Sequence, residues 1–161
     1  MIKMIWAQTQ NGVIGAQGKL PWNIKEEMQH FIRTTKGQDV LMGSKTFDSM
    51  NKKPLPGRTN YVLTNSKEKY QDLNFENLII ISDITELVKK YTNNDQNNLF
   101  VIGGNVVYTL FFPFANEIIK TVVKNDYQGD TFISNFDYKN FKLESSEDYP
   151  EFIIEYWKRG Y

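Results

Sequence analysis

The sequence predicts an α/β fold in which one mostly parallel sheet has helices on both faces and is closed by an antiparallel hairpin. The chain has 161 residues, of which 40% are hydrophobic, and this is the length and apolar content of a single globular domain. Between residues 39 and 112, short apolar runs alternate with helical patterns, as in parallel βαβ units. After residue 117 the helical period disappears, which favours antiparallel strands at the end of the sheet.

The N-terminal part predicts a strand, a loop and a helix. Met1–Gln8 is an apolar run typical of a buried strand. Thr9–Pro21 contains three glycines and few packing residues, so it is expected to be a mobile loop and a candidate lid. Asn23 is expected to cap a helix from Ile24 to about Thr35. The apolar stripe of this helix would consist of Ile24, Met28, Phe31 and Ile32.

The middle of the chain predicts repeated strand-to-helix units. The expected strands are Asp39–Met42, Thr59–Thr64, Leu78–Ile81 and Leu99–Ile102. The expected helices are Ser44–Met50, a segment opened by a capping box at Asp83–Glu86 and ending near Tyr91, and Asn105–Phe112, which Pro113 ends. Pro54–Gly57 is expected to be a turn and Asn93–Asn98 a polar loop. Four further strands are expected at Glu117–Tyr127, Thr131–Ser134, Phe141–Ser145 and Phe152–Arg159.

Composition excludes several classes of function. Nineteen Lys and Arg balance nineteen Asp and Glu, so the chain has no electrostatic footprint for nucleic acid or an acidic membrane. It has no Cys, hence no disulfide framework and no thiolate chemistry, which fits a reducing cytoplasm. With one histidine, a multi-histidine metal site is excluded. The apolar stretch at the N-terminus is too short for the core of a signal peptide, and no apolar run is long enough to span a membrane. A soluble intracellular protein is therefore expected.

Glu27 is the residue that points most directly to chemistry. On a helical wheel it lies at the margin of the apolar stripe, close to Phe31, whereas Glu26 points away. Either its methylene groups cover apolar surface while its carboxylate reaches water, or the carboxylate is held among Ile5, Met28 and Phe31 and needs a partner. In the second interpretation the partner is a ligand that offers two donors in a fork, such as the edge of a pterin or guanine.

Two glycine-containing turns are candidate phosphate sites. Gly103-Gly104 ends an apolar strand and opens a helix, so it is either an ordinary turn or a point where the backbone approaches a pyrophosphate. Gly43–Thr46 fails the P-loop pattern and is either a solvated cap or a simple anion site. The G-x-G-x-x-G fingerprint is absent, which disfavours a standard Rossmann site.

Two cationic positions have competing interpretations. Arg58 follows the rigid turn Pro54–Gly57 and is either a carboxylate clamp or a surface charge. His30 lies four residues after Glu26, and a solvated pair on the outer face of the helix is favoured over a metal site. No metal site is therefore expected.

A set of short motifs lies in a fixed order along nearly the whole chain. It consists of Ala7, Asn11–Gly15, Leu20–Trp22, Glu27, Phe31, Met42-Gly43, Thr46-Phe47, Pro54–Arg58, Val101–Gly104, Tyr108 and Gly129–Thr131. In this order and at these spacings the set resembles the dihydrofolate reductase family. The resemblance implies one domain over residues 1–161, with an eight-stranded twisted sheet, about four flanking helices and an antiparallel C-terminal hairpin strand.

The resemblance also implies a reaction, the reduction of 7,8-dihydrofolate to 5,6,7,8-tetrahydrofolate by hydride transfer from NADPH. An enzyme of this kind supports one-carbon metabolism and the synthesis of thymidylate and purines, and it is a target of antifolate inhibitors. The implied partners are dihydrofolate, NADPH and antifolates, with no nucleic acid and no membrane. A cytoplasmic monomer is expected.

The resemblance assigns roles around the substrate. Glu27 would bind the pterin ring N3 and 2-amino group, and Trp22 and Thr121 would hold water and hydrogen bonds around it; these three form the catalytic set. Met28, Met50 and Leu55 would wall the aminobenzoyl group, and Arg58 would clamp the α-carboxylate of the glutamate tail. The full substrate-binding set is Ile5, Trp6, Ala7, Leu20, Glu27, Met28, Phe31, Met50, Leu55, Arg58, Ile102 and Thr121.

The cofactor residues implied by the resemblance lie mainly in the turns after predicted strands. Ala7 and Ile14 would contact the nicotinamide, residues 43–46 and 103–108 the pyrophosphate and ribose, and residues 64–66 the adenosine 2′-phosphate. The full set is Ala7, Ile14, Gly15, Gly18, Leu20, Gly43, Ser44, Lys45, Thr46, Leu63, Thr64, Asn65, Ser66, Ile102, Gly103, Gly104, Asn105, Val106, Val107 and Tyr108.

In the implied mechanism, Glu27 holds the edge of the pterin opposite N5. It is therefore expected to orient the ring and stabilise developing positive charge, while the N5 proton comes from water admitted by the Thr9–Asn23 lid.

The sequence departs from the family pattern at a few positions. Glu27 stands where bacterial members usually have Asp, Ser44 where many have Arg, and Asn105 where Arg or Lys is frequent. The preference for NADPH would then rest on Lys45 and Lys67. Two alternatives stay open: a reductase of another pterin or a ribosylamino-pyrimidine, which would not need Arg58, and a non-catalytic pterin- or nucleotide-binding module.

Overall fold

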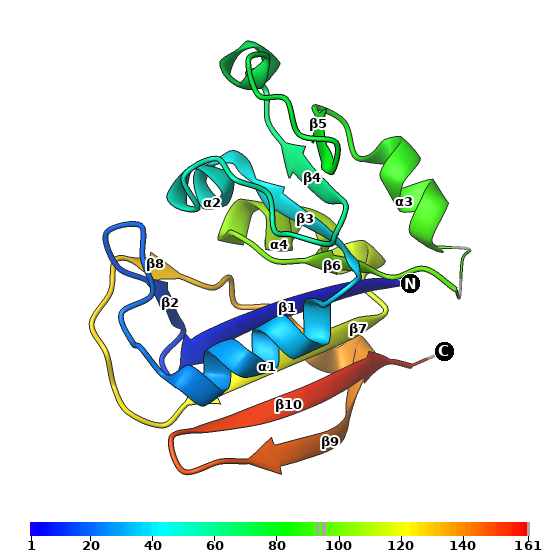
Figure 1. Cartoon of the computed structure of the whole chain (residues 1–161). Helices are drawn as coiled ribbons and strands as arrows, with labels where there is room; N and C mark the ends of the chain where they lie inside the picture. Colours follow the sequence, from blue (N-terminus) through cyan, green and yellow to red (C-terminus); the bar gives the residue numbers. More distant parts are fainter. Residues whose placement is uncertain (93, 95, 161) are drawn as a thin grey trace.

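A twisted eight-stranded sheet runs through the molecule, in the strand order β5-β4-β3-β6-β1-β7-β10-β9 (Figure 1). The computed structural model describes residues 1–92, 94 and 96–160. The strands from β5 to β7 are parallel, and β10 runs antiparallel to both β7 and β9. The strands are β1 (Ile2–Thr9), β3 (Asp39–Gly43), β4 (Asn60–Leu63), β5 (Leu78–Ile81), β6 (Leu99–Val101), β7 (Glu117–Val123), β9 (Phe141–Asp148) and β10 (Phe152–Arg159). The predicted mostly parallel α/β fold with an antiparallel C-terminal end is confirmed.

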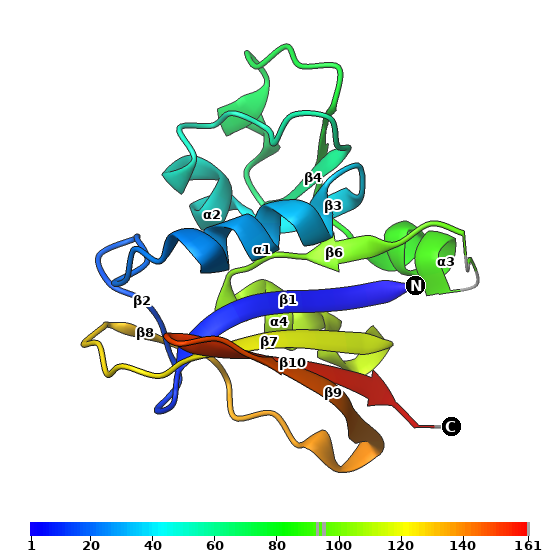
Figure 2. The same ribbon diagram turned by 60° about the horizontal axis from the view of Figure 1, so that its bottom comes forward.

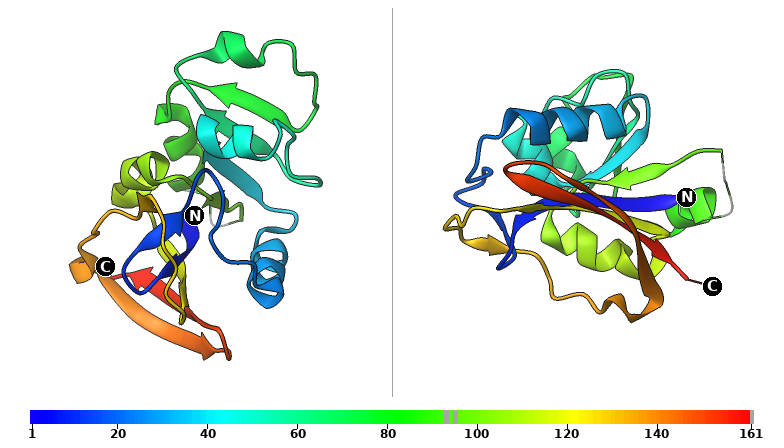
Figure 3. Two further views of the ribbon diagram at one scale, coloured as in Figure 1. Left: turned by 90° about the vertical axis from the view of Figure 1, so that its left-hand side faces the viewer. Right: turned by 90° about the horizontal axis from the view of Figure 1, so that it is seen from below.

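Helices cover both faces of this sheet. In the described part of the chain they are α1 (Lys25–Thr35), α2 (Ser44–Ser49), α3 (Thr85–Thr92) and α4 (Asn105–Phe111). Figures 2 and 3 show α1 and α2 on one side of the sheet and α4 on the other. Short 3-10 turns occur at Lys67–Tyr70, Phe112–Phe114 and Tyr138–Asn140.

Two hydrophobic clusters fill the space on either side of the sheet. Alternate residues of β1 divide between them, because successive side chains of a strand point to opposite faces. Ile5 belongs to the cluster under α1 and α2, and Met4 to the cluster under α3 and α4. Trp6 also belongs to the second cluster, where its ring lies 5.4 Å from the ring of Tyr108. The Trp6 side chain therefore lies on the face of the sheet opposite to that of Ile5.

A second, two-stranded sheet forms outside the main one. It pairs β2 (Val13–Gly15) with β8 (Thr131–Phe132) in antiparallel orientation. Thr9–Pro21 was expected to be a loop without strands, and Thr131–Ser134 was expected among the strands that close the sheet. Both expectations are corrected, because a pairing of two or three residues leaves little periodic signal in either segment.

The inward face of α1 differs from the predicted stripe. Glu27, His30 and Thr35 are buried, whereas Met28 and Ile32 are 47% and 48% exposed. The Thr35 hydroxyl is accommodated because it donates to the Phe31 carbonyl, 2.9 Å away. Ile24 occupies the N-cap position without a side-chain cap, so the predicted cap at Asn23 is also wrong. Apolar residues on this helix therefore do not all mark its core face.

His30 is a buried residue rather than half of a solvated pair. Its side chain is 4% exposed, Nδ1 lies 3.3 Å from the Thr34 hydroxyl, and Nε2 has no hydrogen-bond partner among the described residues. The predicted outer-face pair with Glu26 is therefore wrong. Burial lowers the pKa of His30, the positive charge of Arg33 lowers it further, and Glu147 opposes the shift.

This burial predicts an acid-sensitive contribution to stability. Because the folded-state pKa of His30 is depressed, the contribution is fully present above 6.5, the ordinary pKa of histidine, and is lost as pH falls through the folded-state pKa. We expect the free energy of unfolding in urea to decrease from pH 7.5 to pH 5.5, and the decrease to be smaller in His30→Leu. His30 is the only histidine, so no other imidazole titrates in this window. Equal decreases in the two proteins would contradict the assignment.

Two further observations bear on the predictions. The expected polar loop at Asn93–Asn98 includes residues 93 and 95, which lie outside the described residues. Within the described ranges, no helix has both the length and the apolar character needed to traverse a bilayer, and no group of three or more His, Cys, Asp or Glu residues is placed to hold a metal ion.

Candidate active site

A cavity of about 560 Å³ lies at the carboxyl ends of the parallel strands β3, β4, β5 and β6. This is the edge of an open α/β sheet where ligands bind. The residues that line it are Gly43, Ser44, Lys45, Thr46, Leu63, Thr64, Asn65, Ser82, Asp83, Ile84, Gly104, Asn105, Val106, Val107 and Leu110. Most of the cofactor residues implied by the resemblance are thus brought together in one cavity.

The turns after β3 and β6 meet through glycines that have no room for a side chain. The Gly43 N–H donates to the Gly103 carbonyl, 2.8 Å away. A Cβ on Gly43 would lie 3.0 Å from Val107 Cγ2, which is tighter than ordinary packing allows. Gly103 has φ +122°, and its peptide bond to Gly104 is cis. The two backbone turns therefore form a cradle that a larger residue would fill.

Tyr108 ties this cradle to the central strand. Its buried hydroxyl donates to the Ile5 carbonyl, 2.7 Å away, and burial raises the pKa of the phenol well above its ordinary value. A Cβ on Gly103 would lie 3.2 Å from this hydroxyl. The position of the β6–α4 turn is thereby fixed relative to β1.

Glu27 is buried on the α1 side of the sheet, with 7% of its surface exposed. Burial raises its pKa, and the Trp22 side chain opposes this rise in part. Trp22 is itself buried, and its indole N–H makes no hydrogen bond of ordinary geometry with a described residue. Thr121, 1% exposed, faces Ala7 in the register of β1 and β7. The carboxylate also has no salt bridge with a described Lys or Arg.

Apolar residues surround this carboxylate on the same face. The cluster under α1 and α2 contains most of the apolar substrate residues that the resemblance implies: Ile5, Ala7, Phe31, Met50, Leu55 and Ile102. Met28, on α1, and Leu20, in the loop before it, are exposed. Because Met28 follows Glu27 on an open side of the helix, it is free to contact a ligand.

Arg58 is anchored to the far end of α1. Its Nε donates to the Thr35 carbonyl at 2.9 Å, and its Nη1 donates to the Pro56 carbonyl at 3.2 Å. These bonds fix the direction of the guanidinium, which is the property a bidentate clamp requires. Helix α1 thus carries the Glu27 carboxylate near its start and supports the Arg58 guanidinium, through the Thr35 carbonyl, at its end.

The candidate lid is docked on the loop that precedes β8. The Gln17 N–H donates to the Asp130 carboxylate at 3.0 Å, and the Asp130 N–H donates to the Gly15 carbonyl at 3.0 Å. A Cβ on Gly129 would lie 2.4 Å from that same carbonyl oxygen. Gly18 lies in open space at φ +77°, away from packed neighbours. The hydrogen bonds of Asp130 to Gln17 and to Gly15 hold the lid against this loop.

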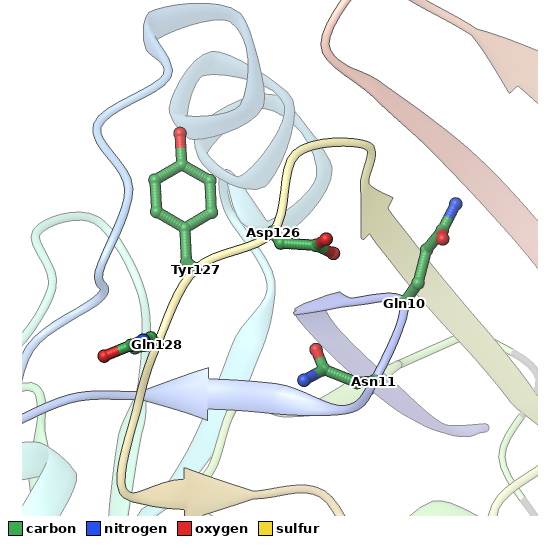
Figure 4. A pocket seen from close by; sticks show the side chains of 5 residues that line it. All are labelled: Gln10, Asn11, Asp126, Tyr127 and Gln128. Atoms are coloured by element: carbon green, nitrogen blue, oxygen red, sulfur yellow. The ribbon is translucent and has the colours of Figure 1, made fainter.

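A second cavity, about 620 Å³, lies between the loops that follow β1 and β7 (Figure 4). It is lined by Gln10, Asn11, Asp126, Tyr127 and Gln128. The Tyr127 ring packs on Trp22 with centroids 5.8 Å apart, so this cavity adjoins the Glu27 site. Tyr127 was not among the residues expected at the site.

Sequence reasoning also missed four residues of the first cavity, namely Ser82, Asp83, Ile84 and Leu110. A usable signal was present for each. The first three directly follow the expected strand Leu78–Ile81, and ligands bind beyond the carboxyl ends of such strands. Leu110 is one helical turn after Val106, so the two share a helix face.

A family profile, curated relatives and a solved structure point to one family. A family profile described as dihydrofolate reductase matches residues 1–153. A dihydrofolate reductase of Ureaplasma parvum is 37% identical over 157 residues, which is 98% of this chain and 96% of that protein. A dihydrofolate reductase of Lactococcus lactis is 40% identical over 148 residues, 91% and 86% of the two chains. A solved structure of the Enterococcus faecalis dihydrofolate reductase, complexed with NADP(H) and RAB-propyl, superposes with a TM-score of 0.83 at 29% identity and covers 99% of this chain and 96% of that one.

Proposed function

Because the chain belongs to the dihydrofolate reductase family, we propose that Glu27 is the residue that holds the pterin ring of its substrate. The reaction is the reduction of 7,8-dihydrofolate to 5,6,7,8-tetrahydrofolate with NADPH, and antifolates are its inhibitors. The observation that carries the proposal is a buried carboxylate without a cationic partner among the described residues. Such a group is costly unless a ligand supplies donors, and the pterin N3–H and 2-amino group form the fork that a carboxylate accepts.

The first cavity fits a dinucleotide. Its glycine cradle lets the backbone approach a ligand closely, Thr46 and Thr64 contribute hydroxyl groups, and Lys45 contributes a positive charge. NADPH, when bound, supplies the hydride that is added to C6 of the pterin. Residues 43–46 and 103–108 would hold its pyrophosphate and ribose, while Ala7 and Ile14 would contact the nicotinamide.

The N5 proton needs a separate route, because Glu27 holds the opposite edge of the ring. Hydride at C6 and a proton at N5 together complete the reduction. The buried Trp22 indole N–H, which makes no hydrogen bond of ordinary geometry with a described residue, and the buried Thr121 on the same face of the sheet support a role for both in orienting water and the ring. The lid over residues 9–23 then governs the access of that water.

Arg58 is proposed to bind the α-carboxylate of the glutamate tail. In Arg58→Gln we expect the KM for dihydrofolate to increase about tenfold or more, because a charge-assisted bidentate pair is lost. A dihydropteroate substrate, which has no glutamate, should show an unchanged KM in the same variant. If both substrates lose affinity equally, Arg58 acts by supporting Thr35 and α1 rather than by contacting the tail.

The decisive test of the proposed function is the loss of reduced-nicotinamide absorbance when the purified chain is mixed with dihydrofolate and NADPH. Turnover that depends on both compounds and is abolished by a dihydrofolate-competitive antifolate is the expected result. Tight binding of both compounds without turnover would favour a binding module. Turnover only with a pterin or pyrimidine that lacks the glutamate tail would favour the alternative reductase.

We further propose that the protein acts as a single-domain monomer in the cytoplasm and does not bind nucleic acid. The balanced charge and the absence of Cys support this proposal. Light scattering on the purified chain tests the oligomeric state, and a mass near twice 18.9 kDa would contradict it.

A further inference from the structure

The cavity over β3–β6 is lined by two side chains of opposite charge that follow different strands. Among the described residues that line it, the one cation is Lys45 and the one anion is Asp83. Lys45 lies at the start of α2, directly after β3, whereas Asp83 follows β5 at the edge of the sheet. Because β4 separates these strands, the end of the cavity near β5 has a negative and not a positive side chain.

The Asp83 carboxylate is held in a fixed orientation. Its Oδ1 accepts hydrogen bonds from the backbone N–H and the hydroxyl of Thr85, at 2.7 and 2.6 Å. These bonds lower the pKa of Asp83, so the group is ionised at neutral pH. Oδ2 accepts no hydrogen bond from a described residue, which leaves one oxygen available to a ligand.

Apolar side chains line the cavity from α4 and from the turns after β4 and β5, and they suggest where the adenosine lies. Val106 is 80% exposed and Leu110 42% exposed on α4, although both are apolar and line the cavity. Leu63 and Ile84 line it from the turns after β4 and β5. Exposed apolar groups on both sides of a cavity are suited to a flat aromatic base. The ribose attached to that base would then lie near residues 64–66 and Asp83, whose loops adjoin through the Thr64 N–H bond to the Ile81 carbonyl.

The two nicotinamide cofactors differ only at this ribose. NADPH carries a 2′-phosphate, which is stabilised by cations, whereas NADH carries a 2′-hydroxyl, which donates to a carboxylate. We propose that this chain also uses NADH as a hydride donor, and that the Asp83 carboxylate determines its weak discrimination between the two cofactors. This inference rests on the proposed placement of the cofactor.

The test is a comparison of dissociation constants, measured by quenching of tryptophan fluorescence with NADPH and NADH. In the wild-type chain the two constants should differ by about tenfold or less. Asp83→Asn retains an oxygen that accepts from Thr85 but removes the charge, so it should tighten NADPH, weaken NADH and increase the ratio by about three- to tenfold. Asp83→Ser, which also keeps a capping oxygen, should shift the ratio in the same direction.

Glu86→Gln is the matched control. It makes the same change in net charge one turn further on α3, at a side chain that is 92% exposed and does not line the cavity. We expect it to change the ratio by less than about twofold, because Glu86 does not line the cavity and solvent screens its charge. An equal shift in Glu86→Gln and Asp83→Asn would show a general charge effect and overturn the assignment to Asp83.

The remaining outcomes separate this inference from the proposed function. If wild-type chain binds NADPH more than about a hundredfold tighter than NADH, the inference is overturned while the proposed function stands. If the chain binds neither cofactor and does not reduce dihydrofolate, both are overturned. Single-turnover reduction of dihydrofolate by NADH, at a rate that depends on NADH binding and not on contaminating NADPH, would support the inference directly.

Discussion

Glu27→Gln should lower kcat/KM for dihydrofolate by about 10²- to 10⁴-fold, the range lost when a positioned charge at a reacting centre is removed. Gln keeps the shape of the side chain but offers one acceptor and one donor pair in place of two charged acceptors. It therefore cannot complete the fork with the pterin N3–H and 2-amino group, and it cannot stabilise positive charge on the ring.

The same substitution should stabilise the fold at neutral pH. Burial raises the pKa of Glu27 above its ordinary value of 4.5, so the folded state binds this proton more tightly than the unfolded state. The resulting stabilisation is fully present below pH 4.5 and is lost as pH rises through the folded-state pKa. Relative to wild type, the free energy of unfolding of Glu27→Gln should thus increase from pH 4.5 toward pH 7.5.

Steady-state kinetics and urea unfolding at these two pH values measure both effects. Glu26→Gln is the control, because Glu26 is the preceding residue on α1 and is exposed. It should change neither kcat/KM nor the pH dependence of stability. A Glu27→Gln variant with undiminished turnover would remove the central assignment of the site.

Gly129→Val should slow hydride transfer by about 10- to 100-fold, the loss expected when reacting groups are misplaced by about an ångström. A Cβ at position 129 would lie 2.4 Å from both the Gly15 carbonyl oxygen and Val13 Cγ1, so β2 and the loop before β8 must separate. That separation stretches the bond between the Gln17 N–H and the Asp130 carboxylate, which holds the lid. Single-turnover kinetics should show the loss, with a much smaller change in the dissociation constant of dihydrofolate.

Gly160→Ala is the matched glycine substitution. Its Cβ would lie 3.7 Å from the Asn140 carbonyl, an ordinary contact distance, and turnover should be unchanged. Wild-type hydride transfer in Gly129→Val would mean that the docking of β2 on this loop does not control the reaction.

The order of the elements was predictable from the sequence because the central strands are short apolar runs separated by glycine and proline. Leu99–Val101 and Asp39–Gly43 are buried almost throughout, so their patterns are unambiguous. Pairings of two or three residues, such as β2 with β8, were not predictable, because neither partner has an apolar period of its own.

The site was predictable where a motif fixes the backbone and not where packing determines which face is buried. The glycine turns and Glu27 could be singled out from the sequence, but the pattern left their roles open, and only the ordered set of motifs that resembles the family assigned them. Met28 and Ile32 looked like core residues because hydrophobicity alone does not distinguish a ligand wall from a core. Tyr127 and Asp83 lie in loops, and their positions depend on contacts with segments distant in the sequence.

One consequence concerns α1, which carries Glu27 near its first turn and Thr35, the support of Arg58, at its end. Because an α-helix is rigid, a tilt of α1 that moves Glu27 also moves Thr35, and the reverse. Truncating the ligand and mutating the helix would thus give non-additive losses in affinity. Resistance substitutions at the Thr35 end of α1 would then weaken the binding of an inhibitor ring at Glu27 solely by displacing the helix.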